Sequence, residues 1–307
     1  MRDTCIDLLT PAINKSENPV VVDATLGLGG HSEALLESNP NLVLIGIDRD
    51  LDAIVKAKNR LAKFENRVKL NHAIFDEITD VVNSFGFEQV DGILFDLGVS
   101  SMQLDQSDRG FSYSQDAPLD MRMDRSTGIT ASEIINTYAP GELVRILRTY
   151  GEEKFATRIV ENIVKERAKA PLNSTAQLAT LVKESIPAAT RRTGGNPAKR
   201  TFQALRIETN DELGAVNRAI PQALELLKVG GRLVVMSFQS LEDRIVKEIF
   251  TQATTSGTPR DLPIDLPEFA AKFALVVRGS VLPSEAEIAA NSRAQSVRLR
   301  AIERLAA

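Results

Sequence analysis

The sequence has few of the side chains on which several functional classes depend. Among 307 residues there are one cysteine and two histidines, and tryptophan is absent. The single cysteine, Cys5, excludes an intrachain disulfide and fits a reducing compartment. With so little His and Cys, we expect no zinc site. The plentiful Asp and Glu leave a carboxylate site for Mg²⁺ open, but we assign no metal ligand. No apolar run approaches the length needed to cross a bilayer, and the N-terminal segment lacks a signal-peptide pattern, so we expect a cytoplasmic protein without membrane contact.

The net charge of −4 by itself argues against a nucleic-acid partner, but the distribution of charge does not. Residues 141–206 hold thirteen Lys and Arg against six Asp and Glu, which leaves the rest of the chain strongly acidic. Between Ser185 and Arg206 there is no acidic residue at all. A local basic region of this kind predicts a polyanionic partner better than the total charge does.

Continuous apolar strands alternate with amphipathic helices over the first hundred residues and again near the C-terminus. Such alternation is typical of a parallel sheet with helices on both faces. We therefore predict an α/β, Rossmann-like fold with a mostly parallel sheet. The expected domains are a discontinuous sheet domain, 1–105 and 207–307, and an inserted helical domain, 106–206. The buried strands are expected at 20–24, 42–50, 68–72, 90–98 and 232–238, the last after a Gly230–Gly231 turn.

The insert shows no strand pattern. Apolar residues at helical spacing, such as Phe155, Ile159 and Ile163, predict helices there instead. A further helix is expected to begin with Asn196 as its N-cap and Pro197 in its first turn. The other helices are expected near 131–138, 141–149, 152–169 and 174–186.

A glycine-rich turn, "DATLGLGGHSEALL", follows the first strand. Gly27, Gly29 and Gly30 would let a ligand approach the bare backbone, and Asp48 ends the second strand 21 residues after Gly27. An acid at that point can accept both hydroxyls of a ribose, as in dinucleotide-binding sheets. The pattern fits NAD and S-adenosylmethionine about equally. A turn that merely needs positive φ is the structural alternative.

Two details favour S-adenosylmethionine. The turn is not G-x-G-x-x-G, because Ser32 stands at the third glycine position. Asp23, at the end of the first strand, would repel a pyrophosphate but could receive the ammonium of a methionine moiety. An Asx turn is the alternative role for Asp23.

A third acid, Asp96, ends the fourth strand in "FDLGVSS" and would face the same crevice. It could accept a hydrogen bond from a substrate amine and so orient a poor aromatic nitrogen nucleophile for in-line methyl transfer. A capping role at the strand end is the alternative. Enzymes that methylate carbon 5 of a pyrimidine generally use a cysteine nucleophile. Because Cys5 precedes the first strand and is expected to pack in a helix, we favour a nitrogen or oxygen acceptor.

The basic loop "ATRRTGGNPAKR" leads to a helix N-terminus and suits contacts to phosphate. Its expected RNA-binding residues are Arg191, Arg192, Lys199 and Arg200. A solvated charged face is the alternative. Three aromatic residues of the insert could stack on a base or could pack in the core instead: Phe111, Tyr113 and Phe202.

Taken together, these stretches resemble the bacterial MraW/RsmH family, which methylates N4 of a cytidine in 16S ribosomal RNA with S-adenosylmethionine. The resemblance rests also on "RGFSYSQDAPLDMRMD", "NPAKRTFQALRIETNDEL" and "GGRLVVMSFQSLEDRIVK" and covers nearly the whole chain. It implies a helical substrate-recognition insert and a substrate within the small ribosomal subunit. The cofactor site that it implies consists of Gly29, Gly30, His31, Asp48, Phe75, Asp96 and Gln103. In it Phe75 would line the adenine and Gln103 would lie near the methionine end.

The sequence departs from the family pattern at a few places. It starts after the His-x-Pro-Val segment with which the family usually begins. Gln239 stands where "SFHSLEDR" has a His, so we assign no catalytic role there, and Asn196 replaces a frequent His or Lys. We predict a SAM-dependent rRNA (cytosine-N4)-methyltransferase, with a homodimer as one arrangement. The proposed reaction needs no metal. The alternatives are a NAD-dependent oxidoreductase and a non-catalytic ribosome-binding factor on the same fold.

Overall fold

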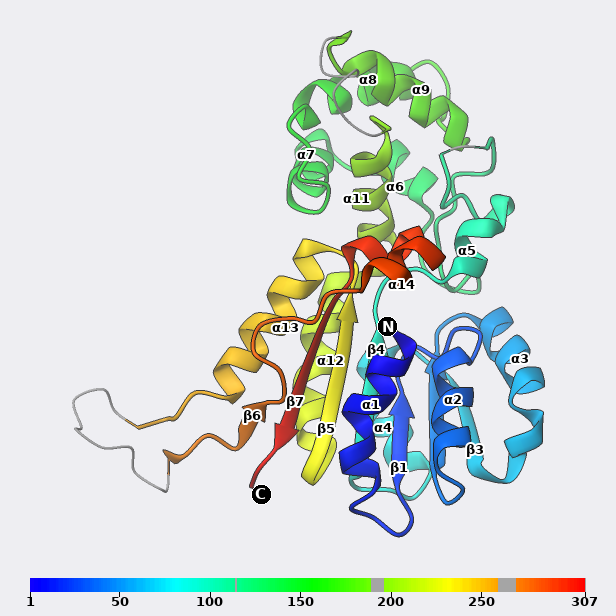
Figure 1. The fold of residues 1–307 in the computed structure, drawn as a ribbon. Helices are drawn as coiled ribbons and strands as arrows, with labels where there is room; N and C mark the ends of the chain where they lie inside the picture. Colours follow the sequence, from blue (N-terminus) through cyan, green and yellow to red (C-terminus); the bar gives the residue numbers. More distant parts are fainter. Residues whose placement is uncertain (114, 189–195, 259–268, 307) are drawn as a thin grey trace. The chain divides into compact units, whose positions relative to one another are not determined.

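The computed structural model describes residues 1–113, 115–188, 196–258 and 269–306 (Figure 1). The chain divides into two compact units. The first, called here the sheet unit, comprises Met1–Gly98 and Leu213–Ala307. The second, called here the helical unit, comprises Val99–Glu212.

A seven-stranded sheet in the order β3-β2-β1-β4-β5-β7-β6 forms the centre of the sheet unit. The first five strands pair in parallel, whereas β7 pairs antiparallel with both β5 and β6. This confirms the predicted α/β class with a mostly parallel sheet. The strands are β1 (Val20–Asp23), β2 (Val43–Asp48), β3 (Val68–His72), β4 (Val90–Asp96), β5 (Leu227–Ser237), β6 (Phe273–Leu275) and β7 (Arg298–Arg304).

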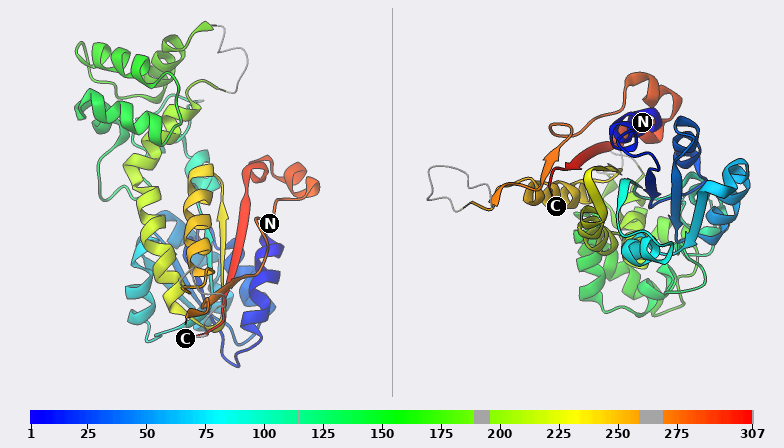
Figure 2. Two further views of the ribbon diagram at one scale, coloured as in Figure 1. Left: turned by 90° about the vertical axis from the view of Figure 1, so that its left-hand side faces the viewer. Right: turned by 90° about the horizontal axis from the view of Figure 1, so that it is seen from below.

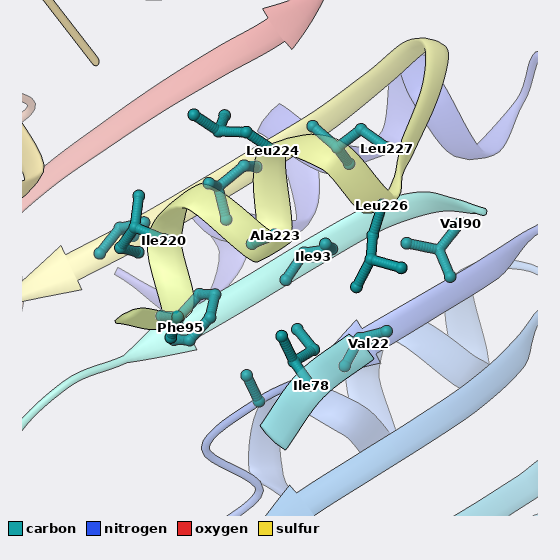
Figure 3. Close-up of a cluster of buried hydrophobic side chains, with 14 of the residues drawn as sticks. Val22, Ile78, Val90, Ile93, Phe95, Ile220, Ala223, Leu224, Leu226 and Leu227 are labelled. Carbon is teal, nitrogen blue, oxygen red and sulfur yellow. The ribbon is translucent and has the colours of Figure 1, made fainter. Parts of the chain in front are cut away.

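Helices cover both faces of this sheet, as strands buried on both sides require (Figures 1 and 2). Alternate residues of β4 show the division: Leu94 packs in the cluster of α1, α2 and α3, while Ile93 and Phe95 pack in the cluster of α4, α12 and α13. Figure 3 shows Ile220 and Ala223 of α12 over β4. The helices are α1 (Arg2–Ile13), α2 (Gly30–Ser38), α3 (Leu51–Arg60), α4 (Ile78–Ser84), α12 (Glu212–Leu226), α13 (Ser240–Ala253) and α14 (Glu285–Ala290), with short 3-10 helices at Ala62–Arg67, Phe75–Glu77 and Ser292–Ser296.

The helical unit has its own apolar core, built mainly from one face of each of its longer helices. Ile146, Ile159 and Leu205, from three different helices, are fully or almost fully buried in it. Within its described residues the unit contains no strand, only an isolated bridge between Pro118 and Ser174. Its helices are α5 (Ser101–Asp105), a 3-10 turn at Ser107–Arg109, α6 (Ala131–Thr137), α7 (Pro140–Thr149), α8 (Ala156–Arg167), α9 (Thr175–Ser185) and α11 (Lys199–Asn210).

Three local expectations were wrong or incomplete. Asn196 is not an N-cap: α11 follows Ala198, and the Asn196 side chain instead accepts a hydrogen bond from the backbone N–H of Ala198 at 2.9 Å. Gly230 does not separate a helix from a strand, because β5 already begins at Leu227 and passes through the glycines with a shift of register against β4. The antiparallel strands β6 and β7 had no clear signal in the sequence.

Candidate functional site

Three aspartates lie at the carboxyl ends of adjacent parallel strands in the sheet unit. Asp23 ends β1, Asp48 ends β2 and Asp96 ends β4, and β1 lies between the other two strands. In open α/β sheets this edge, where the strand order reverses, is the place at which ligands bind. The structure thus brings to one rim the three acids that the sequence predicted there.

The glycine-rich turn is fastened to this rim through Asp48. The Gly27 N–H donates to Oδ2 of Asp48 at 2.7 Å, and the Asp50 N–H donates to Oδ1 at 2.8 Å. Gly27 and Gly29 have φ of +52° and +75°, a conformation that residues with a side chain rarely adopt. Gly29 is followed directly by α2, so the turn presents open backbone and a helix N-terminus at the sheet edge.

Asp23 has the role of a structural anchor. Its side chain is buried, and it accepts hydrogen bonds from the Ser32 hydroxyl at 2.6 Å and from the Thr25 N–H at 3.3 Å. The second contact is the Asx-turn geometry that the sequence offered as the alternative. Asp23 therefore ties β1 to the turn and to the first residues of α2.

Asp96 is held in place by its backbone while its carboxyl group keeps free acceptor capacity. Its N–H donates to the Thr25 hydroxyl at 2.6 Å, a contact that sequence reasoning missed although Thr25 lies between two predicted site residues. One carboxyl oxygen lies 3.8 Å from Nδ1 of His31. The other oxygen, Oδ1, and Nε2 of His31 are buried without a hydrogen-bond partner among the described residues. Buried polar atoms of this kind mark a place where a ligand or water completes the bonding.

Burial raises the pKa of each of these carboxyl groups. The pKa of Asp23, of Asp48 and of Asp96 rises to about 6 in each case, mainly because desolvation disfavours the charged form. Burial also lowers the pKa of His31, although the charge of Asp96 opposes this shift. At neutral pH the rim therefore carries three poorly solvated negative charges and a neutral imidazole. Such a rim fits a cationic ligand and disfavours a pyrophosphate.

Phe75 supplies an apolar surface beside the same rim. It begins the 3-10 helix that follows β3, and the Ala73 N–H donates to the backbone oxygen of Asp48 at 3.1 Å, which fixes this segment against the end of β2. Its ring packs edge to face on Phe95, with centroids 5.6 Å apart. S-adenosylmethionine needs carboxylates for its hydroxyls and cationic groups, open backbone for close approach, and an aromatic ring. The residues present supply all three and therefore fit that cofactor.

Gln103 belongs to the helical unit. It is buried in α5 and forms a capping box: the Ser100 N–H donates to its Oε1 at 3.1 Å, and its own N–H donates to the Ser100 hydroxyl at 3.2 Å. The side-chain oxygen of Gln103 thus has a structural role at a helix start. Its expected role at the methionine end of the cofactor stays a prediction.

Two of the four predicted RNA-binding residues are exposed at the start of α11. These are Lys199 and Arg200, while Arg191 and Arg192 lie outside the described residues. Of the two roles open to Phe111 and Phe202, stacking on a base or packing in the core, the structure shows the second, because both rings are buried in the core of the helical unit. Tyr113 is partly buried and packs edge to face on Phe202 with centroids 5.6 Å apart.

Gln239 caps α13 just beyond the end of β5. Its amide Nε2 donates to Oε1 of Glu242 at 3.3 Å, and Oε2 of Glu242 accepts the Phe238 and Gln239 backbone N–H groups at 2.9 and 3.1 Å. The amide oxygen of Gln239 is buried without a partner in the described part of the chain. Cys5 is buried in α1, as predicted, and burial raises the pKa of its thiol.

Within residues 1–113, 115–188, 196–258 and 269–306, no three side chains of His, Cys, Asp or Glu gather in a way that could hold a metal ion. Within those same ranges, no helix is both long enough and apolar enough to cross a membrane.

Comparisons with known proteins identify the family of this chain. The model of the MraW methylase family matches residues 1–305. "Ribosomal RNA small subunit methyltransferase H" of Salinispora tropica is 57% identical over 306 residues, which cover 99% of this chain and 82% of that protein. The protein of the same name from Streptomyces avermitilis is 54% identical over 305 residues, or 99% of this chain and 96% of its own.

A methylase family favours methyl transfer over the NAD-dependent alternative. It also confirms the predicted resemblance and, with it, S-adenosylmethionine as the cofactor. The match extends through both units of the fold rather than through the glycine turn alone. Because the family's model matches nearly the whole chain, and relatives more than 50% identical cover it as fully, this chain belongs to the MraW methylase family.

Proposed function

We propose that this protein uses S-adenosylmethionine to methylate the N4 amine of a specific cytidine in 16S rRNA of the small ribosomal subunit, by direct in-line transfer. The names of its relatives support an rRNA substrate in that subunit. The observation that carries the chemistry is the carboxyl group of Asp96, whose side chain is 30% exposed at the rim of the sheet unit and whose Oδ1 has no hydrogen-bond partner among the described residues.

Asp96 would act on the nucleophile. The lone pair of an exocyclic cytosine amine is delocalised into the ring, so the nitrogen attacks poorly until it pyramidalises. A carboxylate that accepts a hydrogen bond from the N–H favours that geometry and holds the amine in line. The backbone of Asp96 is fixed by Thr25, which gives the acceptor the rigid position that such a role requires.

The remaining rim residues would bind the cofactor, which supplies an electrophilic methyl group on a sulfonium. Asp48 would accept the ribose hydroxyls while it holds the turn through Gly27. Gly29 and Gly30 would give close approach to backbone, and Phe75 would line the adenine. His31, with a free Nε2, would contact the donor beside Asp96.

The helical unit would bind RNA, with Arg191, Arg192, Lys199 and Arg200 at the phosphate backbone. Gln103 would lie near the methionine end of the cofactor. A cytoplasmic location and a homodimer are also part of the proposal. The target base would have to leave its stack for in-line attack.

The test is methylation of small ribosomal subunits from a strain that lacks this protein. Purified protein and radiolabelled S-adenosylmethionine are added, and the labelled nucleoside is identified by mass spectrometry. We expect N4-methylcytidine at one position of 16S rRNA. Label on another nucleoside would overturn the proposed acceptor, and no label above background would favour the non-catalytic ribosome-binding factor.

A further inference from the structure

Among the basic residues of the helical unit, two groups differ in their partners. In the first group the charge is offset by a carboxylate within 4 Å. These pairs are Arg122 with Asp120, Arg125 with Asp108, Arg145 with Glu208, Lys169 with Glu166 and Arg206 with Glu212.

Lys165, Arg167 and Lys183, in the last turns of α8 and α9, have no carboxylate partner among the described residues. A further group without such a partner lies at one place. Its members are Arg148 at the end of α7, Lys154 and Arg158 at the start of α8, and Lys199 and Arg200 at the start of α11, called here the turn cluster. All five residues are exposed. The α7–α8 turn and the start of α11, some fifty residues apart in sequence, thus both present positive charge without a carboxylate partner.

Two hydrogen bonds and one close backbone approach show that these segments touch one another. Nη1 of Arg200 donates to the backbone oxygen of Glu152 at 2.9 Å, and Nη2 of Arg148 donates to the Thr157 hydroxyl at 2.9 Å. Gly151 packs so closely on the first turn of α11 that an added Cβ would lie 2.6 Å from the backbone oxygen of Arg200. The α7–α8 turn and the start of α11 therefore form one continuous surface.

Neither acid of the α7–α8 turn forms an ion pair with the turn cluster among the described residues. Glu153 is buried, and its carboxylate accepts the Phe155 N–H at 2.9 Å inside the turn. Glu152 is exposed, and its φ of +48° is a strained conformation for a residue with a side chain. Its backbone oxygen is the one that receives Arg200, so the strained residue fixes a cation of the cluster.

We infer that the turn cluster is a binding surface for the RNA phosphate backbone, to which Arg148, Lys154 and Arg158 contribute together with Lys199 and Arg200. The inference rests on the proposed function and extends it to a part of the chain outside the basic loop. Arginine and lysine side chains that are exposed and unpaired release counterions when phosphates replace them, and this gives affinity without base specificity.

The test compares two double variants with equal loss of charge. K154A/R158A removes two cluster residues for which the structure shows no hydrogen bond, and R125A/K169A removes one arginine and one lysine already paired with carboxylates. Binding of each protein to small ribosomal subunits is measured from about 50 to 300 mM KCl. For K154A/R158A we expect the slope of log K against log salt to fall by about 1.4, and affinity near 100 mM salt to weaken on the order of tenfold. For R125A/K169A we expect the wild-type slope.

Equal slopes for the two double variants would overturn the inference. Thermal unfolding of both variants separates a binding effect from misfolding, because none of the four side chains is buried. The proposed function fails differently: wild-type protein would then give no N4-methylcytidine, whatever the salt slopes. With methylation present, we expect K154A/R158A to raise KM for the subunit more than it lowers kcat.

Discussion

The rim of the sheet unit and the turn cluster of the helical unit have opposite electrostatic designs. At the rim, Asp23, Asp48 and Asp96 are poorly solvated, and burial raises each pKa to about 6. In the turn cluster, Arg148 and Lys154 are basic side chains exposed to solvent. A few buried charges suit one small cation at a fixed place, whereas many solvated charges suit a long polyanion that needs no single register. The comparison predicts that cofactor binding depends on pH and little on salt. It predicts that RNA binding depends on salt and little on pH.

The largest effect is expected from Asp96→Asn. Asparagine keeps an acceptor oxygen but loses the charge that strengthens the hydrogen bond to the amine, so turnover should fall by about 100-fold or more. Because burial disfavours the charged form of Asp96, we expect no loss of melting temperature. Single-turnover methyl transfer and thermal unfolding check both points. Turnover equal to wild type would remove Asp96 from the mechanism.

Asp48→Asn should weaken cofactor affinity by about tenfold, the cost of losing one charge-assisted hydrogen bond. The amide oxygen can still accept the Gly27 N–H, but the amide nitrogen would then face the Asp50 N–H, so thermal unfolding of the variant is measured beside the affinity. Calorimetry with S-adenosylmethionine measures the affinity, and RNA binding at several salt concentrations serves as the control. An unchanged affinity would show that Asp48 only holds the turn.

Gly29→Ala should lower the free energy of unfolding by about 1–2 kcal/mol, because φ of +75° is costly for alanine. The added Cβ would also lie 3.4 Å from Cδ1 of Leu61. Gly30→Ala is the matched control, since Gly30 starts α2 and its Cβ would meet nothing closer than 3.7 Å. Denaturant unfolding compares them, and equal stabilities would contradict the need for glycine at position 29.

The smallest effect is expected in the pH dependence. The folded protein holds protons on Asp23, Asp48 and Asp96 up to about pH 6, while the unfolded chain releases them near pH 4. These groups therefore favour folding more as pH falls from about 6 to 4, and their charges oppose it above pH 6. A cationic ligand offsets those charges, so S-adenosylmethionine should raise the melting temperature more at pH 7.5 than at pH 5.

The neutral product, S-adenosylhomocysteine, is the control for the pH prediction. It lacks the sulfonium charge, so its stabilising effect should change less between the two pH values. Equal pH dependence for the two ligands would show that the rim does not sense the sulfonium. The predicted contrast between the rim and the turn cluster would then be supported only by the salt dependence of RNA binding.

Several parts of the fold follow from local pattern. The runs of apolar residues in Val20–Asp23 and Val43–Asp48 predict buried strands, and strand ends in a parallel sheet must meet at one edge. The positions of Asp48 and Asp96 at the rim could therefore be predicted. The partners of Asp23 could not be chosen in advance, because both an Asx turn and an ammonium contact fit the same spacing.

Other features depended on contacts between distant segments. No local pattern around Arg298–Arg304 predicted an antiparallel strand. This strand, β7, takes its direction and register from pairing with β5, which is distant in the sequence. Phe111 and Phe202 have the side chains of a stacking platform, yet tertiary packing buries them. The contact of Arg200 with Glu152 joins residues 48 positions apart, which no local pattern contains.

By itself, the amino-acid sequence determined the alternation of elements, the rim of acids, the glycine turn and the family, because each is written in residues close together in the chain. Only the tertiary structure decided which polar groups have hydrogen-bond partners. The carboxylate of Asp23 accepts from Ser32, and the side chain of Gln103 accepts within its helix cap. One carboxyl oxygen of Asp96 has no partner in the described chain. The physical reason is that desolvation and hydrogen bonding depend on which distant segments surround a group. The same residue type is therefore an anchor at one strand end and a free acceptor at another.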